Sequence, residues 1–116
     1  TTDFREVPQA MSDLMDWFHN ELKNDVYPPI LALRFYCRFE KIHPFIDGNG
    51  RVGRILFNAI LDKFGYPPIV FFAENKSEHS NALKFFLENR PMKMYKHFLN
   101  QFKKTYRVLD YIFDEK

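Results

Sequence analysis

Apolar residues recur along the chain at intervals of three and four, the spacing that places them on one face of an α-helix. This pattern predicts five helices, at about residues 8–23, 29–41, 50–64, 78–89 and 91–113. Between the third and fourth helices, an apolar run at 66–72 is too short to separate an extended segment from one buried turn. The predicted fold class is therefore all-α, a bundle of helices.

The second and third predicted helices differ in how their apolar residues are distributed. In the second, apolar residues nearly encircle the helix, which is typical of the central helix of a bundle. The third carries polar side chains on one face, at Arg51, Arg54 and Asn58. Its expected inward face comprises Val52, Ile55, Leu56, Ala59, Ile60 and Phe64. We therefore expect a helical hairpin whose connector is the polar stretch before the third helix.

Three residues mark expected features at helix ends. Gly65 follows the third helix with Pro67 two residues on, the usual arrangement at a helix C-terminus. Ser77 is expected to cap the fourth helix, on which Leu83, Phe86 and Leu87 are expected to point inward. These signals set the expected limits of the helices and of the loops between them.

Length and composition indicate a single packed domain over residues 1–116. Hydrophobic residues make up 46% of the chain and aromatic residues 18%, which excludes a disordered class. The net charge of +2 does not indicate a nucleic-acid partner. The single cysteine, Cys37, excludes an internal disulfide framework and favours a reducing, cytoplasmic location. No apolar stretch is long enough to cross a bilayer, so no membrane partner is expected.

The connector between the second and third helices concentrates the chemistry of the chain. It runs from His43 to Arg54 with the sequence His-Pro-Phe-Ile-Asp-Gly-Asn-Gly-Arg-Val-Gly-Arg. Gly48 and Gly50 flank Asn49, and glycine permits backbone angles that turn several N–H groups towards one point. Such a cup of N–H groups binds anions, and the N-terminus of the following helix favours phosphate. The loop therefore predicts a phosphate site.

Charged residues on both sides of this loop extend the prediction. Arg51 and Arg54 lie three residues apart on one helix face, and guanidinium groups suit phosphate oxygens by geometry. Asp47 offers a hard oxygen ligand for Mg²⁺ that bridges phosphates. His43, four residues earlier, has an unperturbed pKa near neutrality and is placed to deprotonate an attacking hydroxyl. Together these residues predict a polyphosphate–Mg²⁺ site with a general base beside it.

Two other classes of function remain open at this point. A Gly-Asn-Gly loop between helices is most often only a turn, so a module that binds nucleotide or a partner without turnover is one alternative. A nucleic-acid binder is the other, suggested by the pI of about 8.7 and the many aromatic residues. The aromatic residues fall on apolar stripes, so a core role explains them better. The joint presence of every part of a phosphoryl or nucleotidyl transfer site favours an enzyme.

The connector resembles the signature of the Fic family, His-Pro-Phe-x-(Asp/Glu)-Gly-Asn-Gly-Arg-x-x-Arg. All nine specified positions match, and a looser resemblance extends from the preceding helix, which ends in Phe39 and Ile42, to Asn58 and Leu61 in the next. The resemblance implies a Fic-type bundle that transfers AMP from ATP to a Tyr, Thr or Ser hydroxyl of a target protein. The related Doc kinases depart from this glycine pattern, so Gly48 favours AMP transfer over phosphorylation.

The resemblance also implies a role for each motif residue. His43 is expected to be the general base, and Asp47 to hold Mg²⁺ against the α- and β-phosphates. The anion hole is expected from Gly48, Asn49 and Gly50, with Arg51 on the phosphate tail and Arg54 on the terminal phosphate. Phe45 is expected to be a buried anchor for the loop, and Tyr95 is the candidate to contact the nucleotide base. The same motif also permits another nucleotide donor or the removal of AMP.

Two further expectations come from the family. Family members carry a β-hairpin flap upstream of the motif, and residues 1–6 are expected to be its last strand, with most of the flap and an earlier helix outside this chain. Many members also carry an inhibitory helix with a (Ser/Thr)-x-x-x-Glu-(Gly/Asn) pattern. Thr2 and Glu6 have that spacing, but Val7 follows where Gly or Asn is expected. The inhibitory helix is therefore expected to be absent, to lie upstream of this chain, or to be supplied by a separate protein such as an antitoxin.

Overall fold

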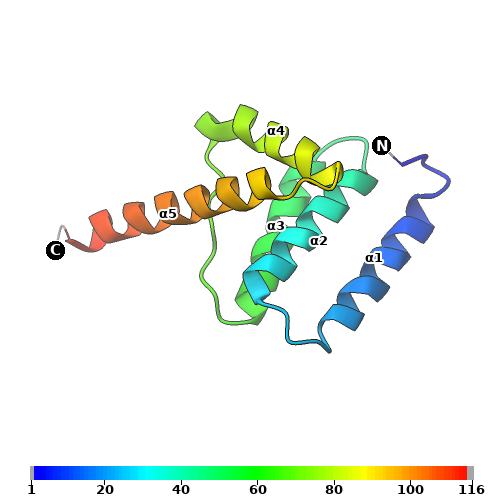
Figure 1. The fold of residues 1–116 in the computed structure, drawn as a ribbon, viewed down its shortest axis with the longest axis horizontal. Helices are drawn as coiled ribbons and strands as arrows, with labels where there is room; N and C mark the ends of the chain where they lie inside the picture. The colour runs from blue at the N-terminus through cyan, green and yellow to red at the C-terminus, as the bar shows by residue number, and fades with distance from the viewer. Residues whose placement is uncertain (1, 115–116) are drawn as a thin grey trace. The chain divides into compact units, whose positions relative to one another are not determined.

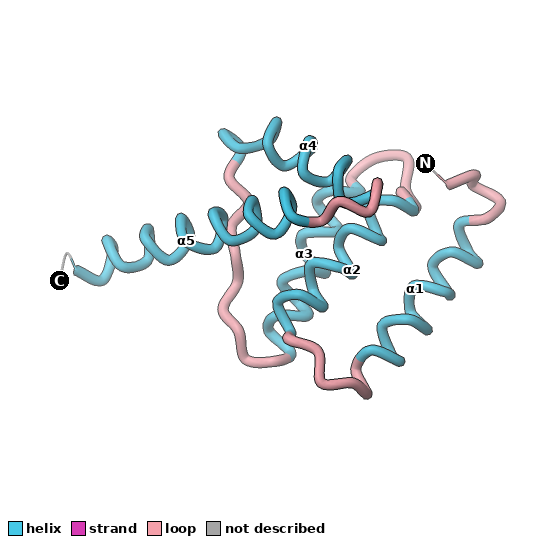
Figure 2. Tube along the Cα trace, in the orientation of Figure 1, coloured by secondary structure: helices cyan, strands magenta, loops and turns pink. Residues whose placement is uncertain are grey.

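The computed structural model describes residues 2–114, with side-chain surroundings for residues 2–108. It divides into two compact units, residues 1–68 and 69–116. The first contains α1 (Val7–Glu21), α2 (Pro28–Ile42) and α3 (Asn49–Lys63). The second contains η1 (Ala73–Asn75), α4 (Lys76–Leu87) and α5 (Met92–Asp114) (Figures 1 and 2). Residues 2–114 contain no strand, so the all-α prediction is confirmed.

Helix α2 is the central helix of the first unit, as its apolar pattern predicted. Pro28 and Pro29 occupy its first two positions, where a missing N–H costs nothing. The helix lies between α1 and α3 (Figure 1). Nine of its fifteen residues are buried: Pro29, Leu31, Ala32, Leu33, Phe35, Tyr36, Cys37, Phe39 and Ile42. Each large apolar side chain removed from water here contributes roughly 1.5–3 kcal/mol to the unit.

Helix α3 buries a face that only partly overlaps the predicted one, with Ile60 buried as expected. Its buried residues are Asn49, Gly53, Phe57, Ile60 and Leu61, whereas Ile55 is 62% exposed. Ala59 and Phe64, which were also expected to point inward, are exposed. The physical reason lies at Gly53, where an added Cβ would come within 2.9 Å of a Glu40 oxygen and 3.0 Å of the Tyr36 ring. Close approach of α2 at this glycine rotates the 53–57–60–61 face inward.

The end of α3 confirms the expectation for Gly65. This residue has φ +79, and its N–H donates to the carbonyl of Asp62 at 3.0 Å. The N–H of Tyr66 donates to the carbonyl of Leu61 at 2.9 Å. This pair of bonds is the Schellman arrangement, which satisfies the last carbonyls of a helix and ends it.

Residues 4–6 form a turn and residues 2–3 are not in a strand, so the expectation of a flap strand at 1–6 is wrong for the part that the structure describes. The N–H of Glu6 donates to the carbonyl of Asp3 at 2.8 Å, and the N–H of Arg5 donates to the Asp3 carboxylate at 3.0 Å. These local bonds lead directly into α1. None of the helices in residues 2–114 has the length and apolar character needed to span a membrane.

In the second unit, α4 begins at Lys76, so Ser77 lies inside the helix and the prediction that it is the cap is wrong. Asn75 stands at the cap position without a capping bond, because its amide oxygen accepts from Gln101 Nε2 at 3.0 Å and from Lys104 Nζ at 2.8 Å. On α4 the buried residue is Ala82, whereas Leu87, expected inward, is exposed. Helix α4 ends at Leu87, and Asn89, two residues further on, has a φ of +64.

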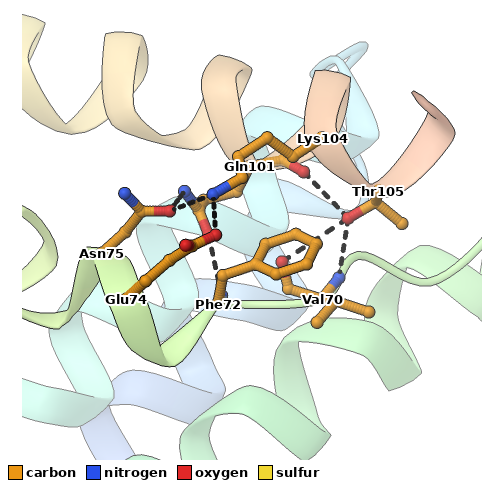
Figure 3. Close-up of polar contacts among 7 residues, drawn as sticks. All are labelled: Val70, Phe72, Glu74, Asn75, Gln101, Lys104 and Thr105. Atoms are coloured by element: carbon orange, nitrogen blue, oxygen red, sulfur yellow. Dashed lines mark hydrogen bonds and ion pairs between the residues drawn. The ribbon is translucent and has the colours of Figure 1, made fainter. Parts of the chain in front are cut away.

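The segment between α3 and η1 is extended and is held by the side chains of α5 (Figure 3). The N–H of Val70 donates to the Thr105 hydroxyl at 3.0 Å, and the N–H of Phe72 donates to Gln101 Oε1 at 2.9 Å. Alternate N–H groups of an extended chain lie roughly 6.7 Å apart, and helix residues four apart rise by roughly 6 Å, so the two spacings match. Side chains on one face of α5 therefore bind the backbone N–H groups of this segment, as a neighbouring strand would bind them in a β-sheet.

Candidate functional site

His43 ends α2 in a left-handed conformation and leaves its imidazole exposed. Its φ is 54 and its ψ is 59, and its N–H donates to the carbonyl of Phe39 at 3.1 Å. Residues other than glycine enter this region at a cost of roughly 1–2 kcal/mol. Pro44 follows and prevents the helix from continuing. The fold thus fixes the backbone of the predicted general base while its side chain stays open to solvent.

The loop after His43 is held in place by the side chain of Asn49. The Asn49 amide oxygen accepts from the N–H of Phe45 at 2.9 Å, and its Nδ2 donates to the carbonyl of Phe45 at 2.7 Å. Asn49 is only 4% exposed, so this two-bond clamp lies inside the protein. Both polar atoms of the Asn49 side-chain amide are therefore used within the loop, and only the backbone N–H of Asn49 remains for a ligand.

Phe45 is not the buried anchor that was expected. Its side chain is 49% exposed, and its ring contacts Phe39 with ring centroids 6.5 Å apart. The anchor function falls instead to Asn49, which holds Phe45 through the main chain. A backbone clamp fixes the loop without burying the aromatic ring, which explains why the expectation failed.

Gly48 confirms the predicted backbone freedom. It has φ +82 and ψ 9 and stands at the cap position of α3. The first intrahelical bond runs from the N–H of Val52 to the carbonyl of Gly48 at 3.0 Å. The N–H groups of Asn49, Gly50 and Arg51 therefore precede the intrahelical ladder, as the first N–H groups of any helix do. With the helix dipole they make the start of α3 suited to an anion, whereas the N–H of Gly48, which was expected to belong to the anion hole, donates to the Asp47 carboxylate at 2.8 Å.

Asp47 lies beside this anion site with its carboxylate exposed. One oxygen accepts from the N–H of Gly48 at 2.8 Å, which orients the carboxylate at the mouth of the loop. Among the described residues, no group of three or more His, Cys, Asp or Glu side chains is placed to hold a metal ion. A single carboxylate that shares Mg²⁺ with phosphate oxygens and water fits this ion's usual coordination. The residues therefore fit Mg²⁺ when it arrives with a polyphosphate.

The two arginines of the motif lie on the first turns of α3, and both are exposed. The guanidinium of Arg54 lies over Gly50, where an added Cβ would be 3.0 Å from Arg54 Nη1. A side chain at Gly50 would displace this guanidinium. The arrangement places a fixed positive charge next to the open N–H groups, as the sequence predicted.

Sequence reasoning missed a group of side chains on α2 that lies beneath Arg54. Burial raises the pKa of the Glu40 carboxyl above its ordinary value, and the positive charges of His43 and Arg54 act in the opposite direction. Burial and the negative charge of Glu40 raise the pKa of Tyr36, while Arg54 lowers it by its charge and by a side-chain hydrogen bond. Sequence reasoning missed these two polar groups because they lie within the predominantly apolar sequence of α2.

Three other residues singled out in the sequence, Tyr95, Asn58 and Cys37, are half buried or buried. Tyr95 lies in the second unit, half buried, with its ring edge-on to Phe86 at 6.5 Å. Its contact with a nucleotide base stays a prediction. Asn58 is half buried on α3. Cys37 is a free, buried thiol whose pKa is raised by burial, which agrees with an inert role.

Comparison with known proteins agrees with the motif. The model of the Fic/DOC family matches residues 1–61. A protein adenylyltransferase Fic of Drosophila willistoni is 36% identical over 79 residues, which is 68% of this chain and 16% of that protein. A probable protein adenylyltransferase of Aquifex aeolicus is 42% identical over 78 residues, 67% of this chain and 23% of that protein. The chain thus spans less than a quarter of these relatives.

Solved structures show the same similarity. A Fic domain containing signaling protein from Bacteroides thetaiotaomicron is 42% identical, with a TM-score of 0.69 over 72% of this chain and 31% of that one. Fic-1 from C. elegans, carrying E274G, covers 99% of this chain and 35% of its own, with a TM-score of 0.85 at 22% identity. The second likeness establishes the fold alone.

Proposed function

Because the chain belongs to the Fic/DOC family, we propose that it transfers AMP from Mg²⁺-bound ATP to a hydroxyl group of a target protein and releases pyrophosphate. Relatives that share about two thirds of this chain are named protein adenylyltransferases, which supports this activity. The observation that carries the proposal is structural. An exposed histidine with a fixed backbone and an open helix N-terminus are joined by a loop that Asn49 clamps.

In this proposal His43 is the general base. Its imidazole takes the proton of the target hydroxyl while that oxygen forms a bond to the α-phosphorus. The bond from the α-phosphorus to the pyrophosphate oxygen breaks, and pyrophosphate leaves with the electron pair. Covalent attachment to the enzyme is not needed, so positioning and electrostatics supply most of the rate enhancement. The left-handed conformation of His43 serves this role because it fixes the backbone from which the imidazole extends.

The start of α3 binds the phosphates. The N–H groups of Asn49 and Gly50 face the anion, Arg51 contacts the phosphate tail, and Arg54 holds the terminal phosphate. Asp47 would hold Mg²⁺, which supplies positive charge to the phosphates when it is bound. Gly48 supports nucleotidyl transfer over phosphorylation. Its φ of +82 favours glycine, and Doc kinases depart from the glycine pattern of this motif.

The remaining parts of the proposal concern partners. The substrate is a protein with an accessible hydroxyl. Among residues 2–114 the inhibitory pattern is incomplete, since Val7 follows Glu6, which supports an inhibitory partner such as an antitoxin. We propose a cytoplasmic location, where ATP is abundant, and the single buried thiol of Cys37 agrees with a reducing compartment.

The test uses ATP labelled at either the α- or the γ-phosphate, with Mg²⁺ and a cell lysate as the source of targets. We expect the chain to label protein from the α-label alone and His43→Ala to lose this labelling while still binding ATP. His19→Ala removes an exposed histidine from α1 and is the matched control, with labelling unchanged. Labelling from the γ-label alone would make the protein a kinase. Labelling at a normal rate by His43→Ala would overturn the proposed base.

A further inference from the structure

Helix α5 carries an apolar stripe that is separate from the face it turns towards its own unit. Between residues 92 and 108, its buried residues are Met94, His97, Phe98, Gln101 and Thr105. A second series, which we call the seam, recurs at intervals of three and four and consists of Met92, Tyr95, Leu99, Phe102 and Tyr106. On a helix of 3.6 residues per turn, the two series lie roughly 120° apart. In the sequence, Leu109 and Phe113 continue the spacing of the seam.

The seam is apolar, yet much of it is open to solvent. Met92 is 61% exposed and Leu99 is 50% exposed, while the three aromatic members of the seam are half buried. The rings of Phe102 and Tyr106 contact each other, with their centroids 4.4 Å apart and their planes inclined by 31°. Apolar surface that stays in water gains free energy when another molecule covers it, so the seam is suited to a partner.

The helix that packs against α5 in this unit is too short to follow it to its end. Helix α4 packs along α5 and has 12 residues, whereas α5 has 23. At 1.5 Å per residue these helices are roughly 18 Å and 35 Å long, so α4 accompanies only about half of α5. Figure 1 shows the second half of α5 continuing past α4. The later part of the seam therefore has no helix of its own unit beside it, among the residues that the structure describes.

The spacing of the seam fits another helix better than a flat surface. Alternating intervals of three and four place its residues at the a and d positions of a heptad, the pattern by which two helices wind around each other. A stripe confined to a and d is narrower than the apolar face of an ordinary core helix. Helices that lie on membranes present a large apolar face to the lipid instead. The seam therefore has the width of a helix–helix contact.

Charges beside the seam indicate which helix would fit. Residues 92–108 contain five lysine and arginine residues and no aspartate or glutamate. Lys96 and Lys103 follow the d positions directly, where flanking charges of a helix pair meet, and both are exposed. On the other flank, Phe98 and Thr105 are buried. In this stretch a second copy of the chain supplies further lysines and no carboxylate, so an acidic helix is the complementary partner.

We propose that the seam of α5 is a docking surface for an amphipathic helix of a partner protein. This helix has apolar residues at its own a and d positions and acidic residues on the flank that meets Lys96 and Lys103. Burial of the seam supplies the affinity, and the carboxylates select this partner over a basic or neutral helix. The docking surface is independent of the proposed transfer of AMP, because none of its residues belongs to the motif loop.

The experiment measures the binding of two synthetic peptides to the whole chain by calorimetry. Both peptides have three heptads with Leu at a and d, and they differ only in carrying Glu or Lys at e and g. We expect the Glu peptide to bind roughly tenfold more tightly than the Lys peptide, since two lysines attract the first and repel the second. The double variant Lys96→Glu with Lys103→Glu should reverse this preference.

A pair of matched variants tests the apolar part of the surface. Leu99→Ala should weaken binding of the Glu peptide by roughly tenfold or more, because the leucine loses its burial against the peptide. Val108→Ala is the control. Val108 lies on the same helix and is 49% exposed, but its position is on the opposite side of α5 from the seam. Circular dichroism checks that both variants keep their helices.

A preference for the Glu peptide supports the proposal if Leu99→Ala weakens it, Val108→Ala preserves it and the double variant reverses it. Equal binding of both peptides, or binding of neither, overturns the proposal. Dimerisation of the chain in sedimentation experiments that Leu99→Ala abolishes would assign the seam to a second copy and overturn it too. Binding to vesicles of anionic phospholipid without binding of the Glu peptide would overturn it in favour of a membrane surface.

Discussion

Two non-helical segments of this protein satisfy their backbone hydrogen-bonding groups in different ways. The loop from Pro44 to Gly48 and the segment from Ile69 to Phe72 both contain backbone N–H and C=O groups that lie outside the regular hydrogen bonding of a helix. In the first, Asn49 clamps Phe45 from four residues away. In the second, Thr105 and Gln101 bind Val70 and Phe72 across 35 and 29 residues.

The two segments differ in whether their backbone N–H donors remain available to a ligand. Along the 69–72 segment, the N–H groups of Val70 and Phe72 are taken up by α5, so they have no capacity for a ligand. In the motif loop the clamp fixes the chain at Phe45, and the N–H groups at the start of α3 stay open. A segment that supports the fold consumes its donors, whereas a segment that binds a ligand holds its donors still without using them.

The largest expected effect comes from breaking the clamp. Asn49→Ala removes both bonds to Phe45, so the loop and the open N–H groups lose their fixed positions. We expect AMP transfer to fall by about a hundredfold, since a misplacement of about 1 Å can cost this much, and stability to fall by only about 1 kcal/mol. Transfer assays and urea unfolding measure the two effects.

The control for the clamp is Asn20→Ala, which removes the same side chain from an exposed position on α1. It should leave both transfer and stability close to those of the parent chain. If Asn49→Ala keeps normal transfer, the clamp is not what holds the phosphate site in place, and the contrast between the two segments loses its functional meaning.

The opposite segment should show the opposite pattern. Thr105→Val keeps the shape of the side chain and removes the hydroxyl that accepts from Val70, so an N–H loses its partner. We expect the free energy of unfolding to fall by about 1–2 kcal/mol, with no change in pyrophosphate affinity. Thr105→Ser, which keeps the hydroxyl, should retain most of the stability. A loss of pyrophosphate affinity in Thr105→Val would contradict the division of roles.

The sequence predicted the motif loop far better than the 69–72 segment, for a physical reason. The loop is built from local contacts, and its chemistry is readable in twelve consecutive residues, including the glycine at 48 that takes a positive φ. The 69–72 segment is fixed by partners roughly thirty residues away. The buried polar residues His97, Gln101 and Thr105 recur at intervals of four on α5, a stripe that could have been noticed, but nothing near it names its partner.

Errors within the first unit have a similar origin. The apolar residues of α3 allow more than one inward face, and the choice was made by the contact between Gly53 and α2, which periodicity does not contain. Phe45 was expected from the family resemblance to be a buried anchor, yet its main chain carries the anchoring function. The buried carboxylate oxygen of Glu40 was overlooked because its burial depends on the close approach of α2 and α3 at Gly53.

A pH dependence should separate the two units. Burial lowers the pKa of His97 below its ordinary value, an effect that the charge of Glu78 opposes. His79 Nδ1 lies 3.0 Å from His97 Nε2, so one of these two facing nitrogens carries the hydrogen and the other accepts it. The unfolded chain then binds protons more readily, and this contribution to stability is complete above about pH 6.5 and is lost as the pH falls below it.

Urea unfolding at pH 8 and pH 5 tests this expectation. His97→Gln removes the titrating group and should reduce the loss of stability at pH 5. His19→Gln changes an exposed histidine and should leave the pH dependence as it was. An equal pH dependence in the parent chain and in His97→Gln would show that His97 does not control the acid sensitivity of the second unit.

The smallest expected effect concerns the backbone of His43. Both His43→Gly and His43→Ala remove the imidazole, but only glycine adopts φ 54 without strain. We expect the glycine variant to be more stable than the alanine variant by about 1 kcal/mol, with transfer abolished in both. Thermal unfolding measures the difference. Greater stability in the alanine variant would mean that the left-handed conformation carries no cost.

The central claim is that the N–H groups at the start of α3 are open to a phosphate ligand while those of the 69–72 segment are not. An NMR titration of ¹⁵N-labelled chain with Mg²⁺ and pyrophosphate tests it directly. We predict saturable shifts of the Asn49, Gly50 and Arg51 amide signals, with the Val70 and Phe72 signals unchanged. Unmoved signals at residues 49–51, or equal shifts in both segments, would contradict the account.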